Sequence, residues 1–292
     1  MPTHNDRLRL AELSPANFAI VMATGIIGVD AHQRGHERLG TGLLVIGALA
    51  WAVLAVLNLV RLSRHPRSML ADLRSHQRAP GFLSWAPATA VLASLWLALG
   101  LPMAEARWLA GLAAVLWVVS TYGVLMALTL ARDKPLLGEA ISGSWLLVVV
   151  ATQSIAVLAV LLGSGFAQPQ RLVLNFVAVA MWLCGGMIYV WVISLIFYRY
   201  AFLRVAPQDF TPTYWINMGA MAISTLAGAS LVMNAAQAPF LAGLLPVLKA
   251  GTLLCWAVGT WWIPLLGGLA GWRYLRARHP LRYDVGYWGA VF

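Results

Sequence analysis

Polar side chains inside long apolar runs are the groups of this sequence that could do chemistry. Hydroxyl and amide groups at membrane depth can replace part of an ion's hydration shell. They can equally form hydrogen bonds between helices, which are worth about 0.6 kcal/mol each on average in membranes. Both roles stay open at this stage. The candidates for an ion lining are Asn17, Thr24, Thr89, Thr152, Gln153, Asn217 and Thr225.

Patterns typical of catalysis or metal binding are incomplete in the sequence. His32 and His36 have helical spacing, but Arg34 lies between them and the acidic residue of a zinc protease motif is missing. His65 and Asp72 are too far apart for a membrane acyltransferase box, and no Gly-rich phosphate loop is present. We therefore expect no catalytic residue, no metal and no cofactor, and we do not expect an enzyme.

The composition indicates which solvent surrounds these groups. Of the 292 residues, 61% are hydrophobic and 10% are charged, far from the balance of a soluble domain. The apolar runs recur almost from end to end and leave no segment for a separate soluble core. We expect a short cytoplasmic tail over residues 1–13 and one transmembrane transporter or channel domain over 14–292.

Eight apolar runs are long enough to cross a hydrocarbon core, which takes about 20 helical residues. They lack the ten-residue alternation of a membrane barrel, so the predicted fold class is an all-α integral membrane protein. Short connections predict helical hairpins. The expected spans are 14–31, 39–61, 81–101, 107–131, 140–163, 172–198, 211–234 and 241–272.

Positive charge is distributed unevenly over the two sides. Fifteen of the 20 Lys and Arg residues fall in the first tail, the even-numbered loops and the last segment. The positive-inside rule then places the amino terminus in the cytoplasm of a multi-pass protein of the cell (inner or plasma) membrane. The net charge of +10 is scattered through short loops, so the expected partner is the lipid bilayer and not nucleic acid.

The spans differ in kind. The odd-numbered ones carry the polar candidates, whereas spans two, four and eight consist mostly of Leu, Val, Ala and Trp. Because polar residues in membranes face the bundle interior or a cavity, we expect the odd helices to form an inner ring around a central pore and the even helices an outer ring. Pro15 is suited to a first helical turn, and Pro87 predicts a kink in the third span.

Several stretches resemble the tellurite-resistance/dicarboxylate transporter family, which includes fungal malate permeases and plant slow anion channels. The resemblance implies ten helices in five hairpins, often assembled as a trimer. It also implies passage of small inorganic or organic anions, such as C4-dicarboxylates, chloride-like anions or tellurite-type anions. The stretches are PANFAIVMATGII (15–27), SWLLVVVATQSIAVL (144–158), TYWINMGAMAISTLAG (213–228), TWWIPLL (260–266) and YDVGYWGAVF (283–292).

The same resemblance implies a gate. A phenylalanine of the ninth helix blocks the pore in the closed form of family members, and that residue corresponds to Phe292. The sequence stops at this residue, so we expect eight spans and the start of a ninth. Four hypotheses stay open: an anion channel or facilitator, a proton-coupled dicarboxylate carrier, a non-conducting remnant and, least favoured, a membrane-embedded enzyme.

Overall fold

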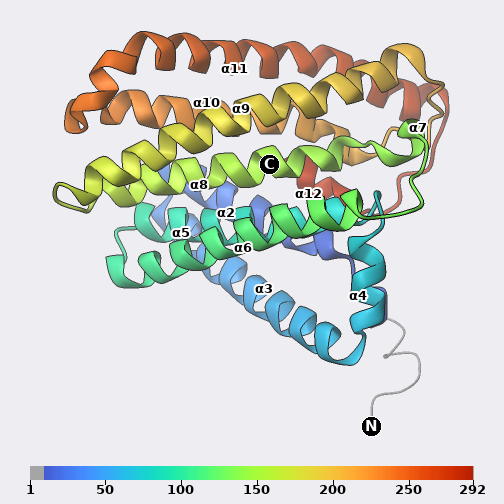
Figure 1. Ribbon diagram of the computed structural model, residues 1–292, viewed down its shortest axis with the longest axis horizontal. Coiled ribbons are helices and arrows are strands. Elements are labelled where there is room, and N and C mark those ends of the chain that lie inside the picture. Colours follow the sequence, from blue (N-terminus) through green and yellow to red (C-terminus); the bar gives the residue numbers. More distant parts are fainter. Residues whose placement is uncertain (1–9, 292) are drawn as a thin grey trace.

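A computed structural model describes residues 10–291 of the chain. Its regular elements are helices, and the long ones run roughly along one axis (Figure 1). Seven of them are long and apolar enough to cross a membrane. The prediction of an all-α integral membrane protein is confirmed.

Residues 10–291 form four helical hairpins. Their first helices are α2 (Ala19–Gln33), α5 (Trp85–Ala98), α8 (Leu147–Ser164) and α10 (Ile216–Asn234). Their second helices are α3 (Glu37–Arg64), α6 (Met103–Thr129), α9 (Gln170–Phe202) and α11 (Pro239–Gly271). Short helices α4 (Pro66–Leu73) and α7 (Leu137–Ala140) lie in connections, and α12 (Gly286–Val291) is the last described element.

The first expected span is shorter in the structure than the others. It consists of α2, which has 15 residues, preceded by a four-residue 3-10 turn. This length leaves it outside the seven helices that qualify as spans by length and composition. It nevertheless packs between α3 and α5, as the first inner helix should.

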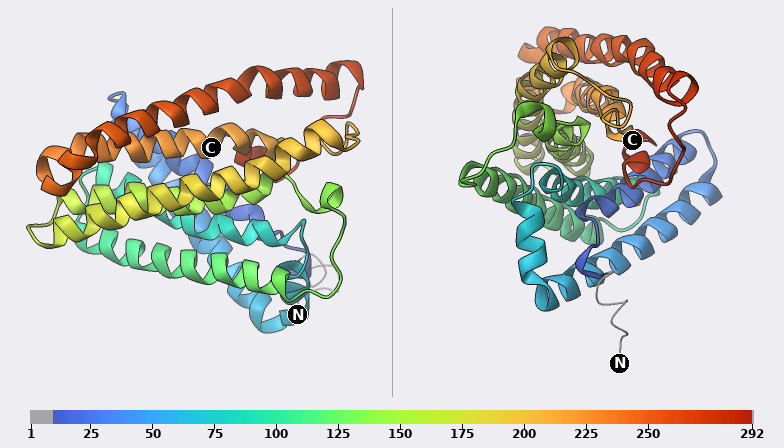
Figure 2. Two further views of the ribbon diagram at one scale, coloured as in Figure 1. Left: turned by 45° about the horizontal axis from the view of Figure 1, so that its top comes forward. Right: turned by 90° about the vertical axis from the view of Figure 1, so that its right-hand side faces the viewer.

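Burial separates the two classes of helix. In the most apolar stretch of Gly143–Ser164, 89% of the residues are buried, against 11% in Pro239–Arg276. Neighbouring first helices pack against one another in the order α2, α5, α8, α10. The end-on view in Figure 2 shows α3 and α11 on the outside of the bundle. The predicted inner ring of odd helices and outer ring of even helices therefore describes this arrangement.

Each of the four inner helices starts with a 3-10 turn, which we call its entry turn. The entry turns are η1 (Pro15–Phe18), η2 (Ala79–Ser84), η3 (Gly143–Leu146) and η4 (Pro212–Trp215). Pro15 and Pro212 stand at the first positions, where a missing N–H costs nothing. All four turns lie at one end of the bundle, which we call the vestibule end; the opposite end is the far end.

Glycine lets the entry turns touch. A Cβ atom on Gly143 would lie 2.2 Å from the carbonyl oxygen of Thr213, and one on Gly81 would lie 2.8 Å from the backbone nitrogen of Ala16. Backbone therefore packs on backbone between η3 and η4 and between η1 and η2. The fifth position of the ring is taken by α12, which packs against α2 on one side and η4 on the other.

Three buried arginines lie at the vestibule end, in or just after the last turn of a second helix. Arg61 Nη2 donates to the Ala11 carbonyl at 2.8 Å, and Arg199 Nη1 donates to the Ile141 carbonyl at 2.5 Å. Arg273, just after α11, donates to the Phe210 carbonyl. Each accepting carbonyl lies shortly before the entry turn of the same hairpin. These arginines therefore join the end of the second helix of a hairpin to the segment that leads into its first helix.

Candidate functional site

The entry turns surround a cavity of about 680 Å³, the vestibule. Its lining comes from the segments that start all four inner helices, from the segment that starts α12 and from the end of α9 with the residues after it. The vestibule therefore lies at the mouth of the inner ring. The residues that carry its chemistry are Arg78, Glu139, Ser142, Ser144, Arg199, Arg204, Asp209, Thr211, Thr213 and Asp284.

Polar groups recur at the start of the inner helices, two residues apart. The hydroxyls of Ser142 and Ser144 lie 2.7 Å apart before and in η3, and those of Thr211 and Thr213 lie 2.8 Å apart before and in η4. Ser14 accepts a hydrogen bond from the N–H of Ala16 in η1 in the same relative positions. The first N–H groups of a helix have no partner within the helix and carry partial positive charge. The mouth of the ring is thus lined by hydroxyls and by the positive ends of helices.

Some charges of the vestibule are held closely by neighbours. Arg78 forms a 2.6 Å ion pair with Asp72, which also holds the buried Arg61 at 2.6 Å. The Asp284 carboxylate accepts from the N–H of Gly286 at 2.6 Å. Arg199 is more weakly paired, because its Nη2 lies 3.9 Å from Asp209 although the residue is 6% exposed.

A second, smaller cavity of about 170 Å³ lies between the inner helices toward the far end. Each of the four inner helices contributes residues three or four apart, so one face of each helix turns to this space. The lining is apolar apart from Gln33 and the hydroxyls of Ser94, Ser154 and Ser230. Within the part of the chain that the structure describes, the lining contains no ionisable side chain, and each of the three hydroxyls donates to a carbonyl of its own helix.

Four of the predicted lining residues are directed toward the outer helices. Thr89 accepts a hydrogen bond from Trp51 of α3, and Thr152 accepts one from Trp117 of α6. Gln153 donates to the Trp182 carbonyl of α9. The methyl group of Thr24 would lie 3.8 Å from a Cβ atom on Gly47 of α3. None of them lines either cavity. Their contacts are those of packing between the two rings, and a role in conduction stays a prediction.

The other predicted lining residues are dispersed. Asn17 lies half-buried in η1, and the Thr225 hydroxyl bonds to its own helix and borders a groove toward α11. Asn217 is buried at the start of α10, where its carbonyl accepts from Tyr189 of α9 and its side-chain amide has no hydrogen-bond partner. The predicted gate, Phe292, lies outside the described residues.

The two predicted prolines lie near the starts of inner helices. Pro15 occupies the first turn of η1. Pro87 is the third residue of α5 and follows η2 without a break, so it lies inside one helical stretch from Ala79 to Ala98. A kink at Pro87 stays a prediction. Further prolines lie inside α11, at Pro246 and Pro264.

The cavity linings contain residues that sequence reasoning missed. Ser94 and Ser230 face the smaller cavity, and Arg199 faces the vestibule although we assigned it to a loop. A usable signal exists for the serines. On each inner helix the cavity residues follow a spacing of three or four, so Ser94 shares a face with Ala90, and Ser230 with Leu226.

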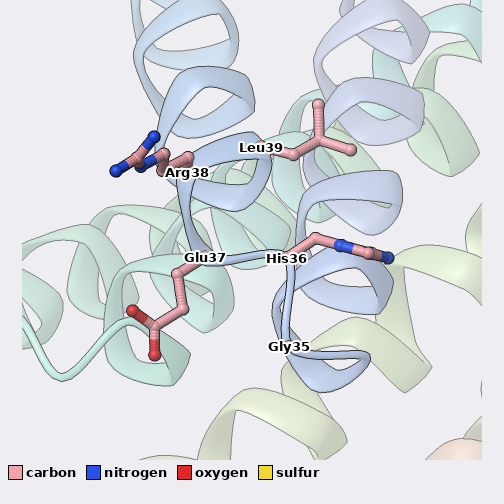
Figure 3. A pocket seen from close by; sticks show the side chains of 5 residues that line it. All are labelled: Gly35, His36, Glu37, Arg38 and Leu39. Atoms are coloured by element: carbon pink, nitrogen blue, oxygen red, sulfur yellow. The ribbon is translucent and has the colours of Figure 1, made fainter.

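A third hollow lies at the far end, in the loop between α2 and α3 (Figure 3). Its side chains do not converge: the picture shows the His36 ring and the Glu37 carboxylate pointing away from each other. Among residues 10–291, no group of three or more His, Cys, Asp or Glu could hold a metal ion. This hollow offers no chemistry of its own.

Comparison with known proteins gives a family match and four relatives. The family model described as "SLAC1: Voltage-dependent anion channel" matches residues 12–292. Two uncharacterized transporters of Methanocaldococcus jannaschii are 22% and 21% identical over 288 and 291 residues, which cover 94% and 95% of this chain and 80% and 79% of theirs. An uncharacterized membrane protein of Mycobacterium tuberculosis is 39% identical over 105 residues, 36% of this chain. The match spans about half (53%) of the length of that mycobacterial protein.

Proposed function

Because the chain belongs to the voltage-dependent anion channel family, we propose that it passes anions through the space enclosed by its inner helices. The observation that carries this proposal is the arrangement of the two cavities. One lies at the mouth of the inner ring and the other lies between the same four helices farther along. Family membership supports anion transport in general, and the substrate is part of the proposal.

The lining favours anions over cations. Entry turns and hydroxyls surround the vestibule, and the positive ends of helices attract negative charge. The smaller cavity has no carboxylate that would bind a cation. Chloride-like anions and C4-dicarboxylates such as malate are the proposed substrates, with tellurite-type anions as a further class.

We propose passive conduction and not proton-coupled transport. A coupled carrier uses an ionisable relay group at membrane depth. The lining of the smaller cavity has none. The vestibule residues Arg199 and Asp209 are ionisable, but they lie at the mouth and not within the ring.

The proposed setting is the cell membrane, with the vestibule open to the cytoplasm. The bias of Lys and Arg supports this orientation, because the buried and exposed arginines around the vestibule lie on the side rich in positive charge. A homotrimer and a gate at Phe292 belong to the proposal through the family resemblance. Crosslinking in native membranes tests the trimer, and Phe292→Ala tests the gate by a rise in anion flux.

Flux into liposomes tests the function. Liposomes containing the purified chain should take up chloride or malate with and without a proton gradient, whereas protein-free liposomes should not. Uptake that requires the proton gradient would support a proton-coupled carrier and contradict passive conduction. Absence of uptake of either anion under both conditions would overturn the proposal.

A further inference from the structure

The feature of the vestibule that the proposed function leaves unused is the guanidinium of Arg199. It extends from the last turn of α9 to the junction between the segments that lead into η3 and η4. Its Nη1 donates to the Ile141 carbonyl at 2.5 Å and to the Tyr214 hydroxyl at 2.6 Å. The residue is 6% exposed, and it lines the vestibule.

The rest of this guanidinium is not satisfied by the protein. Nε is buried and has no hydrogen-bond partner among residues 10–291, and Nη2 faces Asp209 across 3.9 Å. That distance exceeds a hydrogen bond, and a buried guanidinium normally forms close, often bidentate, bonds to its counter-ion. Arg61 and Arg273 also have a buried Nε without a partner, so the unpaired Nε is shared by the three arginines. The difference lies in the counter-ion, since Arg61 Nη2 lies 2.6 Å from Asp72.

The Asp209 carboxylate is bound to the backbone of its own loop, at Ala206. One of its oxygens, Oδ2, accepts the N–H of Ala206 at 2.9 Å, and the same oxygen is the one nearest to Arg199. The carboxylate therefore balances the charge of Arg199 without completing its hydrogen bonds. An anion from solution that approaches Nη2 competes with a loosely held partner.

Hydroxyl groups flank this position on both sides. Ser142 follows Ile141, the residue whose carbonyl Arg199 binds, and Thr211 lies two residues after Asp209. The pairs Ser142/Ser144 and Thr211/Thr213 stand at the starts of α8 and α10 with their entry turns. A buried cation, hydroxyl donors and two helix N-termini are the components of a small-anion site.

We infer that Arg199 is the centre of an anion-binding site at the mouth of the ring, where a halide or a carboxylate replaces the weak contact with Asp209 before it enters the pore. This inference rests on the proposed function for its place on the ion path. Among the described residues, Asp209 is the vestibule carboxylate within ion-pair distance of Arg199.

Binding is measured without transport. The purified full chain in detergent is melted in rising sodium bromide, or rising sodium malate, that replaces sodium gluconate at constant ionic strength. A ligand that binds only the folded state raises Tm in a saturable manner, which gives the half-saturating concentration. We expect saturation with at least one of the two anions, and an unchanged Tm with both would overturn the site.

Variants assign the site to Arg199. Loss of a charge-assisted bond in Arg199→Gln should raise the half-saturating concentration about tenfold or more. Asp209→Asn removes the competing carboxylate and should lower the half-saturating anion concentration about threefold. Arg204→Gln removes an exposed arginine of the same vestibule and should change it by less than about twofold. If Arg199→Gln fails to fold, the half-saturating concentration of Asp209→Asn alone tests the site.

The outcomes separate the site from the proposed function. Unchanged anion dependence in both Arg199→Gln and Asp209→Asn would overturn the site, even in a chain that conducts. The expected shifts together with liposomes that pass no anion would leave the site standing and refute conduction.

Discussion

At the vestibule end of the bundle, Arg61 and Asp72 form an ion pair in which the arginine side chain is fully buried, whereas at the far end Asp30 and Arg34 form a pair whose side chains are 59% and 72% exposed. Both pairs join acidic and basic groups within hydrogen-bond reach. Only the first is removed from water. The charges of the Arg61–Asp72 pair are therefore part of the packing, and those of the Asp30–Arg34 pair are solvated.

The largest expected effect comes from unpairing the buried charge. Asp72→Ala leaves Arg61 without a counter-ion in a buried site and should destabilise the protein by about 3 to 5 kcal/mol. The matched change at the far end, Asp30→Ala, should cost less than about 1 kcal/mol. Thermal unfolding in detergent measures both. Equal losses in the two variants would contradict the comparison.

A smaller loss is expected where the entry turns meet. Gly143→Ala introduces a Cβ atom against the Thr213 backbone, which cannot move as a side chain could, and should cost about 3 kcal/mol. Gly186→Ala in α9 is the control, because a Cβ atom there meets nothing within 4 Å. Tm of the two purified variants is the measurement. If Gly143→Ala is as stable as Gly186→Ala, the entry turns do not pack as tightly as the structure has them.

Filling the smaller cavity with a bulkier side chain tests the apolar half of the proposed ion path. Val157→Phe replaces an aliphatic side chain by an aromatic ring in the cavity of about 170 Å³. It should reduce anion flux by about tenfold, since a narrower apolar passage excludes hydrated ions. Val53→Phe on α3 changes the same residue type on an outward face and should leave flux unchanged. Liposome flux per folded protein gives the ratio. Full flux through Val157→Phe would place the ion path elsewhere.

The smallest effect tests a predicted lining residue. Thr152→Val removes the acceptor of the Trp117 indole and should lower stability by about 0.6 kcal/mol, the average for such bonds in membranes. Anion flux and selectivity should stay as in the unchanged chain. A change in the ratio of chloride flux to malate flux would show that Thr152 lines the ion path.

Much of the fold could be predicted from the sequence because it depends on composition and run length. Apolar runs of about 20 residues predicted the spans, and the polar content of the odd runs predicted the inner ring. These are local quantities. The 3-10 entry turns were not predicted, because their glycines matter through contacts with distant backbone, as Gly143 does with Thr213.

The candidate site could be predicted only in part. Polarity singled out Thr89 and Thr152 but not the direction in which they face. That direction follows from tryptophans 38 and 35 residues away in the chain, whose indole N–H groups need acceptors. Arg61, the last residue of the second expected span, and Arg199, just after the sixth, were counted with the loop charges, yet they are 0% and 6% exposed. Their burial depends on carbonyls of remote segments, which no local pattern reveals.

The buried arginines at the vestibule end also bear on how the chain is assembled. In the first, third and fourth hairpins, an arginine at or just after the end of the second helix binds a carbonyl that precedes the first helix. The open end of each of these hairpins is therefore closed by its own residues. The last turns of α6, residues 120–129, contain no arginine. Arg78, at the start of the second hairpin, instead binds carbonyls of Glu12 and Leu13. During insertion into the bilayer we expect three hairpins to close independently, and the second to close only on the first.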